Sequence, residues 1–87
     1  MNQTRNEFLI KINTIDNVKR ISRICENYQE DIDISSGRYV IDAKSMLAIF
    51  TFDLMRPLKI KINSDDMDVI ERFNNEMSEF KYEDRWD

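Results

Sequence analysis

Near the start of the chain, apolar residues recur first at one spacing and then at another, and each spacing is typical of a different secondary-structure element. Phe8, Ile10 and Ile12 stand at every second position, which predicts a half-buried strand. From Val18 to Tyr28, apolar residues recur at spacings of three and four, which predicts an amphipathic helix of about three turns. Either Thr14 or Asp16 can cap the first turn of this helix, because both side chains accept hydrogen bonds from free main-chain N–H groups.

In the middle of the chain, apolar and polar residues alternate in two further segments that flank a turn. Residues 31–35 and 38–42 predict two strands, and Ser36-Gly37 between them predicts the turn of a hairpin. Residues 46–50 then predict a short helix, and Pro57 marks a break before the next element.

The last two elements have the clearest patterns. Residues 58–62 read Leu-Lys-Ile-Lys-Ile and predict a strand with one apolar face. Ser64 is the expected cap of a final helix, and Asp65 and Asp66 suit its positive N-terminal end. The expected buried stripe of this helix consists of Met67, Ile70, Phe73, Met77 and Phe80.

The predicted element order is β-α-β-β-α-β-α, in the α+β class. Strands with one apolar face suit an antiparallel sheet that is covered on one side. We therefore expect an open-faced two-layer β-sandwich, with four antiparallel strands and three helices on one face. The expected domain spans residues 7–80, between a disordered N-terminus (1–6) and a charged C-terminal tail (81–87). Trp86 in that tail either covers an apolar edge of the domain or hangs free.

The amino-acid composition excludes several classes of function. The chain has 87 residues and no histidine, which excludes imidazole bases, imidazole metal ligands and phosphohistidine. Thirteen basic and seventeen acidic residues give a net charge of −4, which argues against nucleic-acid binding. Cys25 is the single cysteine, so no zinc site or internal disulfide is expected, and it is expected to be buried. No membrane span, cofactor or metal is expected, and the expected location is the cytoplasm.

The element order and the segment from Gly37 to Leu47 resemble HPr, the small phosphocarrier of the bacterial sugar phosphotransferase system. Its most specific part is Lys44-Ser45-Met46-Leu47, which is similar to the start of the second helix in that family. The resemblance implies the HPr-like fold over the expected domain.

The resemblance fails at the family's active site. The family carries a phosphorylated histidine between its first strand and first helix, whereas Thr14, Ile15 and Asp16 occupy that loop here. The ordinary phosphocarrier reaction is therefore not expected. Loss of the histidine with retention of the serine resembles the Crh branch of the family.

Two sites remain as candidates. The resemblance implies that Ser45 is phosphorylated by HPr kinase, with Lys44 as a nearby countercharge; the alternatives are an N-cap serine and a solvated lysine. Met46, Leu47 and Phe50 are expected to form a partner-binding patch, with Ile49 facing the core; the alternative is that all of them are buried in the core or pack on the C-terminal tail.

Other polar features have simpler explanations. Asp16 could form an acyl phosphate, but a helix cap is the better interpretation. The acidic run 65–68 lacks the spacing of a calcium loop and suits a first helical turn. Lys19, Arg20 and Arg23 form a basic helix face that is either solvated or faces an acidic partner.

The sequence thus predicts a degenerate HPr-like protein without enzymatic activity. We expect a regulatory or protein-binding module that contacts a protein partner through the second helix, HPr kinase being one such partner. The alternative is a structural protein with the HPr fold that forms homo-oligomers and has no phosphorylation role.

Overall fold

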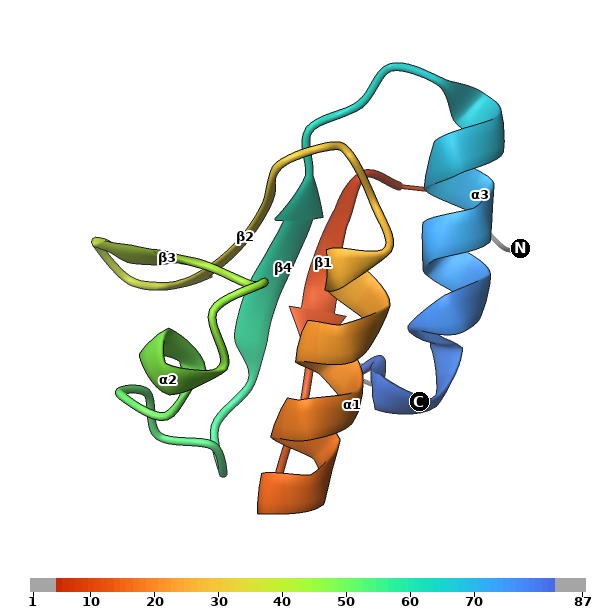
Figure 1. Cartoon of the computed structure of the whole chain (residues 1–87). Coiled ribbons are helices and arrows are strands. Elements are labelled where there is room, and N and C mark those ends of the chain that lie inside the picture. The colour runs from red at the N-terminus through yellow and green to blue at the C-terminus, as the bar shows by residue number, and fades with distance from the viewer. Residues whose placement is uncertain (1–4, 83–87) are drawn as a thin grey trace, which may run out of the picture.

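The computed structural model describes residues 5–82 (Figure 1). The elements along the chain are β1 (Glu7–Ile10), α1 (Ile15–Glu26), β2 (Ile32–Ser36), β3 (Tyr39–Asp42), α2 (Met46–Ile49), β4 (Leu58–Ile62), α3 (Met67–Glu76) and the 3-10 helix η1 (Ser78–Phe80). Residues 1–4 and 83–87 lie outside the described part, and so does the prediction for Trp86.

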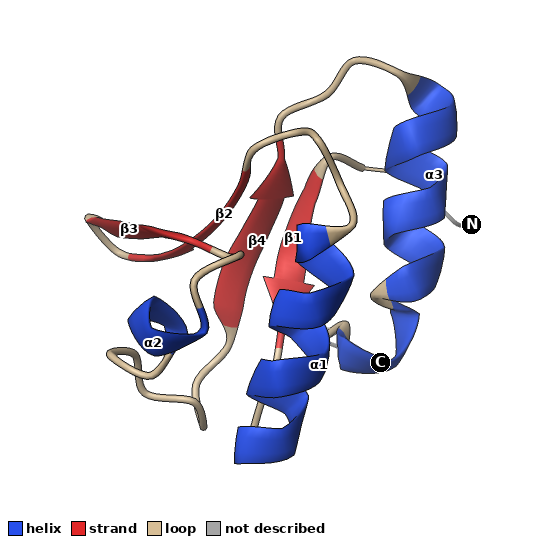
Figure 2. Ribbon diagram, in the orientation of Figure 1, coloured by secondary structure: helices blue, strands red, loops and turns tan. Residues whose placement is uncertain are grey.

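The four strands form one antiparallel sheet in the order β1-β4-β2-β3. On β4, Leu58, Ile60 and Ile62 are buried, whereas Lys59 and Lys61 are exposed on the other face. All helices lie on the apolar face, and the opposite face is left open (Figure 2). The predicted fold class, with three α-helices on one side of a four-stranded sheet, is confirmed.

The core between sheet and helices consists mainly of isoleucine. Eight isoleucines have no exposed surface, and Phe73 is the largest side chain buried to the same degree. Cys25 is also buried on α1, as predicted, and Ile49 is the buried residue of α2. A β-branched side chain fits the sheet well and loses little rotamer freedom there, which suits a core built on strands.

The two edges of the sheet differ. Beside β1, the N–H of Lys11 donates to the carbonyl of Phe80 at 2.8 Å, and the N–H of Tyr82 donates to the carbonyl of Leu9 at 2.9 Å. The chain after η1 therefore forms one bridge with the end of β1 and covers that part of the edge. At the other edge, β3 pairs with β2, and no other described segment pairs with it.

A buried amide joins the two ends of the described chain. The Nδ2 of Asn74 donates to the carbonyls of Arg5 and Ile70, both at 2.8 Å, and its Oδ1 accepts from Nζ of Lys81 at 2.7 Å. Asn74 is 7% exposed, so these bonds satisfy a polar group inside the core. The segments that precede β1 and follow η1 are thus both bonded to α3.

The last helix differs from its prediction. Asp66, not Ser64, is the N-cap: its Oδ1 accepts from the N–H of Asp68 at 2.9 Å, while Ser64 Oγ accepts from the N–H of Asp66. The predicted burial of Met67 is wrong, since this side chain is 58% exposed. The start of α3 lies beyond the ends of β1 and β4 (Figure 1), and burial on this helix begins with the partly buried Val69 and with Ile70. Phe80 is buried, but it belongs to η1.

The hairpin between β2 and β3 turns at the one glycine of the chain. Ser36 pairs with Tyr39, so Gly37 and Arg38 form a two-residue loop. Gly37 has φ of +59°, as the first position of a type II′ hairpin turn requires. The second strand of the hairpin therefore begins at Tyr39, one residue later than the sequence pattern predicts.

Candidate protein-binding surface

The connection from β1 to α1 contains Thr14, Ile15 and Asp16, the loop residues singled out from the sequence. Thr14 is the N-cap of α1, and its Oγ1 accepts from the N–H of Asn17 at 3.1 Å. Of the two residues that the sequence left open as caps, Thr14 has this role, and Asp16 lies exposed in the first turn. Asn13 has φ of +68°, and the N–H of Thr14 donates back to the carbonyl of Ile12 at 2.8 Å. This is a tight, strained three-residue turn.

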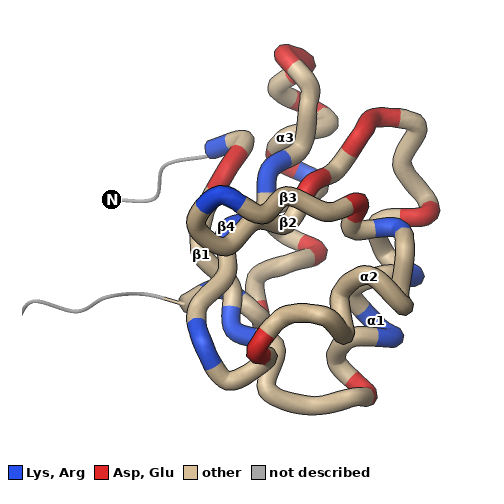
Figure 3. Tube along the Cα trace, turned by 90° about the vertical axis from the view of Figure 1, so that its left-hand side faces the viewer, with Lys and Arg blue, Asp and Glu red and all other residues tan. Residues whose placement is uncertain are grey.

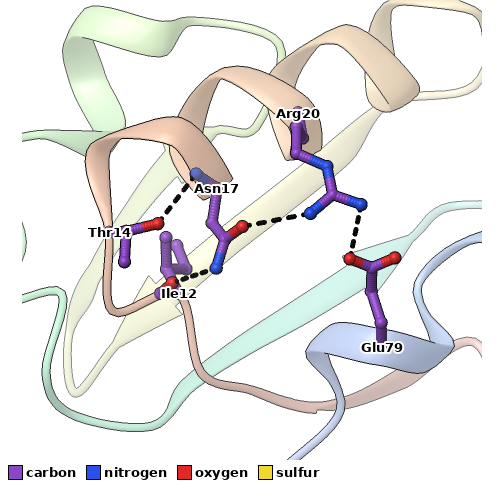
Figure 4. Close-up of polar contacts among 5 residues, drawn as sticks. All are labelled: Ile12, Thr14, Asn17, Arg20 and Glu79. Carbon is purple, nitrogen blue, oxygen red and sulfur yellow. Dashed lines mark hydrogen bonds and ion pairs between the residues drawn. The ribbon is translucent and has the colours of Figure 1, made fainter.

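A polar network fixes this turn to the rest of the protein (Figure 4). The Nδ2 of Asn17 donates to the carbonyl of Ile12 at 2.8 Å, and its Oδ1 accepts from Nη1 of Arg20 at 3.3 Å. The other terminal nitrogen of Arg20 forms an ion pair with Glu79, and the guanidinium lies over the ring of Phe80. The sequence analysis missed Asn17, although its place three residues after a threonine cap is where a capping side chain is expected.

The side chains at this loop are exposed to solvent or bonded within the protein. Thr14, Ile15 and Asp16 are all exposed, and the guanidinium that reaches the loop through Asn17 is already paired with Glu79. Among residues 5–82, no three acidic or thiol side chains gather where they could hold a metal ion. Of the acidic residues at the start of α3, Asp66 is the N-cap and Asp68 lies in the first turn, where the sequence analysis expected acidic residues to suit the positive end of the helix.

Ser45 begins α2 as its N-cap. Its Oγ accepts from the N–H of Ala48 at 3.3 Å, and its own N–H donates to the carbonyl of Asp42 at 3.0 Å. The residue is half-buried. These contacts correspond to the capping alternative, and they leave the phosphorylation of Ser45 as a prediction.

Lys44 is more constrained than either sequence interpretation assumed. Its Nζ donates to the carbonyl of Tyr28, just beyond the end of α1, at 2.7 Å. Its N–H donates to Oδ1 of Asp42 at 2.9 Å, and its carbonyl accepts from Oγ of Ser22 at 3.1 Å. The ammonium group thus joins the start of α2 to the end of α1. A role of Lys44 in partner binding stays a prediction.

The outer side of α2 is apolar. Leu47 is 79% exposed, and Met46 and Phe50 are each exposed by almost two-fifths. Ile49 is buried, as predicted. A four-residue helix cannot bury more than one side, so the remaining apolar side chains face solvent.

Charged residues of α1 lie beside Met46 of α2, since the acidic Glu26 lines the same hollow as the basic Lys19 and Arg23. Lys19 and Arg23 line a hollow of about 310 Å³ together with Met46 of α2. Ile15, 60% exposed, precedes Lys19 by one helical turn on the same side of α1. Basic segments of α1 run beside α2 in Figure 3. The expected basic face is therefore divided, because Arg20 points toward Glu79 instead. We call the set Ile15, Lys19, Arg23, Met46, Leu47 and Phe50 the α1–α2 surface.

Two buried groups have altered acidity. Burial raises the pKa of the Cys25 thiol to about 12. Burial, together with the hydrogen bond that Tyr28 donates to Glu76 at 2.6 Å, raises the pKa of Tyr28. Neither group is suited to act as a nucleophile at neutral pH, since both stay protonated.

The similarity of this chain to known proteins is one of fold. No protein-family model matches the chain, and no curated protein matches it. The crystal structure of HPr-C-His from Thermoanaerobacter tengcongensis is similar, with a TM-score of 0.66 over 84% of this chain and 90% of that one. This chain has the HPr-like fold. The two sequences are 15% identical, so the likeness concerns the HPr-like fold and not the residues of its active site. No helix among the described residues is long and apolar enough to cross a membrane.

Proposed function

We propose that this protein is a degenerate member of the HPr group that acts as a protein-binding module and does not transfer phosphoryl groups. The observation that carries the proposal is the α1–α2 surface, where apolar side chains of α2 stay exposed beside two basic residues of α1. Exposed Met, Leu and Phe side chains close together are typical of docking surfaces. Lys19 and Arg23 favour a partner whose apolar contact residues are flanked by Asp or Glu.

The absence of phosphoryl transfer follows from chemistry. The chain contains no imidazole to carry the phosphoryl group. An aspartyl phosphate at Asp16 would need a bound divalent cation and further carboxylates, which the described part of the chain does not bring together. The expected result is that phosphoenolpyruvate and the general enzyme of the phosphotransferase system leave no label on this protein.

The docking surface is tested with a photo-crosslinking amino acid at Leu47, in cells that express the protein at its natural level. The matched control carries the same amino acid at Met67, which is 58% exposed on α3, away from the surface. We expect a defined heterologous adduct from position 47 that Phe50→Asp abolishes. Equal adducts from both positions, or none from position 47, would reject the docking surface.

We further propose that phosphorylation of Ser45 controls this docking. A phosphate on Oγ would place roughly two negative charges between Lys44 and Met46, where a partner with acidic residues would be repelled. The test is incubation with HPr kinase and ATP followed by mass spectrometry, with Ser45→Ala as the control. A single added phosphate on Ser45 supports regulation, and an unmodified Ser45 removes the regulatory half while leaving the docking proposal standing.

A further inference from the structure

The uncovered edge of the sheet has main-chain groups that face outward. The N–H of Ala43 donates to the carbonyl of Ile32 at 2.8 Å, and Ile34 pairs with Ile41. In an antiparallel ladder, hydrogen-bonded pairs alternate with unbonded pairs, so residues 39, 41 and 43 direct their main-chain groups toward β2. The N–H and carbonyl of Val40 therefore point away from the sheet, and no described residue bonds to them.

This edge is protected only in part, since β3 is four residues long and its one charged residue, Asp42, stands at its end. Tyr39 is 68% exposed and Val40 is 61% exposed, and the strand contains no lysine, proline or bulge of the kind that blocks edge pairing in monomeric proteins. Figure 1 shows β3 at the outer limit of the sheet, with no element beyond it. At the β1 edge of the same sheet, by contrast, Phe80 and Tyr82 bond to Lys11 and Leu9.

We propose that β3 pairs with β3 of a second copy of this chain, antiparallel about a two-fold axis at Val40. Two hydrogen bonds then join Val40 to the partner's Val40, with the carbonyl of each accepting from the N–H of the other. This contact forms one continuous sheet from the two four-stranded sheets. It is separate from the α1–α2 surface and does not depend on the function proposed for it.

Charge selects this position of the axis. With the axis at Val40, Arg38 lies opposite the partner's Asp42 at both ends of the contact. An axis one residue away sets a charged side chain opposite a valine, and an axis two residues away sets Arg38 or Asp42 opposite its own copy. Opposite charges stabilise cross-strand pairs, and like charges destabilise them. With the axis at Val40, both charged residues of β3 and its turn, Arg38 and Asp42, therefore lie opposite a residue of the other charge.

The same register fills a hollow beside the strand. A depression of about 300 Å³ is lined by Tyr39, Val40, Ile41, Thr51 and Phe52. Ile41 lies on the helix side of the sheet, because it pairs with the buried Ile34. The partner's Tyr39 comes to lie opposite Ile41, where its ring contacts the apolar lining. An aromatic residue opposite a β-branched residue is a favourable cross-strand pair.

The first test is Val40→Pro, measured by sedimentation equilibrium from about 10 μM to 1 mM, because so short a contact falls at the small end of specific interfaces. Proline removes an N–H that the β2–β3 ladder does not use, so the fold is retained while the pairing is blocked. We expect a dimer for the natural protein and a dissociation constant at least tenfold higher for the variant. Circular dichroism checks that the variant is folded.

The second test uses charge and does not alter the main chain. Arg38→Glu and Asp42→Arg each set like charges opposite one another in their own homodimers, so each alone should dimerise at least tenfold more weakly. An equimolar mixture restores opposite charges at both ends, and we expect a heterodimer within about threefold of the natural affinity. Asp42→Arg also loses the bond to the N–H of Lys44, and its thermal unfolding shows whether that loss disturbs the fold.

Hydrogen exchange locates the contact. The N–H of Val40 should become protected as concentration rises in the natural protein and should stay unprotected in the single charge variants; Val40→Pro has no N–H at this position and is assessed by its dissociation constant. Phe50→Asp, which would disrupt self-association through α2, should leave the dimer intact. A protein that is monomeric at 1 mM, or a dimer that Phe50→Asp dissociates and Val40→Pro does not, would overturn the proposal.

Discussion

At the scale of single residues, Asn13 is the strained position of the chain. Its φ of +68° lies in the left-handed region, where most side chains cost about 1–2 kcal/mol, and asparagine and glycine cost less. Asn13→Ala should therefore lower the free energy of unfolding by about 1 kcal/mol, measured by urea denaturation. Asn13→Gly should leave it unchanged or raise it, and equal losses in both variants would show that the side chain and not the backbone matters.

Cys25 predicts a pH dependence of stability. Its pKa in the folded protein, about 12, lies above the ordinary value of 9.0, so folding favours the protonated thiol. The resulting stability is complete below pH 9 and is lost as the pH rises toward 12. Urea denaturation at pH 10.5 should give a free energy of unfolding lower than at pH 8 by about 1–2 kcal/mol. Cys25→Ala should flatten that slope in part, because Tyr28 shifts in the same direction; an unchanged slope would contradict the assignment to the thiol.

At the scale of elements, α2 depends on its attachments because it buries one residue. Lys44→Met keeps the apolar stem but removes the ammonium bond to the carbonyl of Tyr28. We expect a loss of about 1–2 kcal/mol in the free energy of unfolding and faster amide exchange throughout α2. Lys59→Met, at an exposed position of β4, serves as the control and should change neither quantity. If α2 exchanges at the natural rate in Lys44→Met, the bond to α1 does not hold it.

Some features of the elements could be predicted from the sequence, and others could not. The period of two in β4 and the three-to-four spacing in α1 depend on burial of one face, so they could be predicted from the chain alone. The cap and first turn of α3 could not, because the exposure of Met67 depends on where the neighbouring strands end. In the candidate surface, the exposure of Leu47 follows from the shortness of α2. The bond from Lys44 to Tyr28 and the link from Asn17 to Glu79 join distant segments, and no local pattern indicates them.

At the scale of the whole molecule, Asn74 bonds to segments near both ends of the described chain. Asn74→Leu would leave the carbonyl of Arg5 and the ammonium of Lys81 without this partner, inside or beside the core. We expect a loss of about 2–3 kcal/mol in the free energy of unfolding, together with faster exchange in β1. Asn75→Leu is the neighbouring control, since Asn75 is exposed, and should cost less than about 0.5 kcal/mol. Similar losses in both variants would argue against the role of the buried amide.

The unequal edges of the sheet bear on how large an assembly this protein can form. A strand that pairs on both sides would allow copies to add without limit, as in a fibril. Here Phe80 and Tyr82 already bond to Lys11 and Leu9 at one end of the β1 edge, so we expect growth of a pair joined at β3 to stop at two. Truncation after Phe80 removes the N–H that Tyr82 donates to Leu9, and we expect the shortened chain to form large aggregates that bind thioflavin T. That result would show that the few residues after η1 prevent further copies from pairing with β1. A truncated protein that stays dimeric would show that the β1 edge needs no such cover.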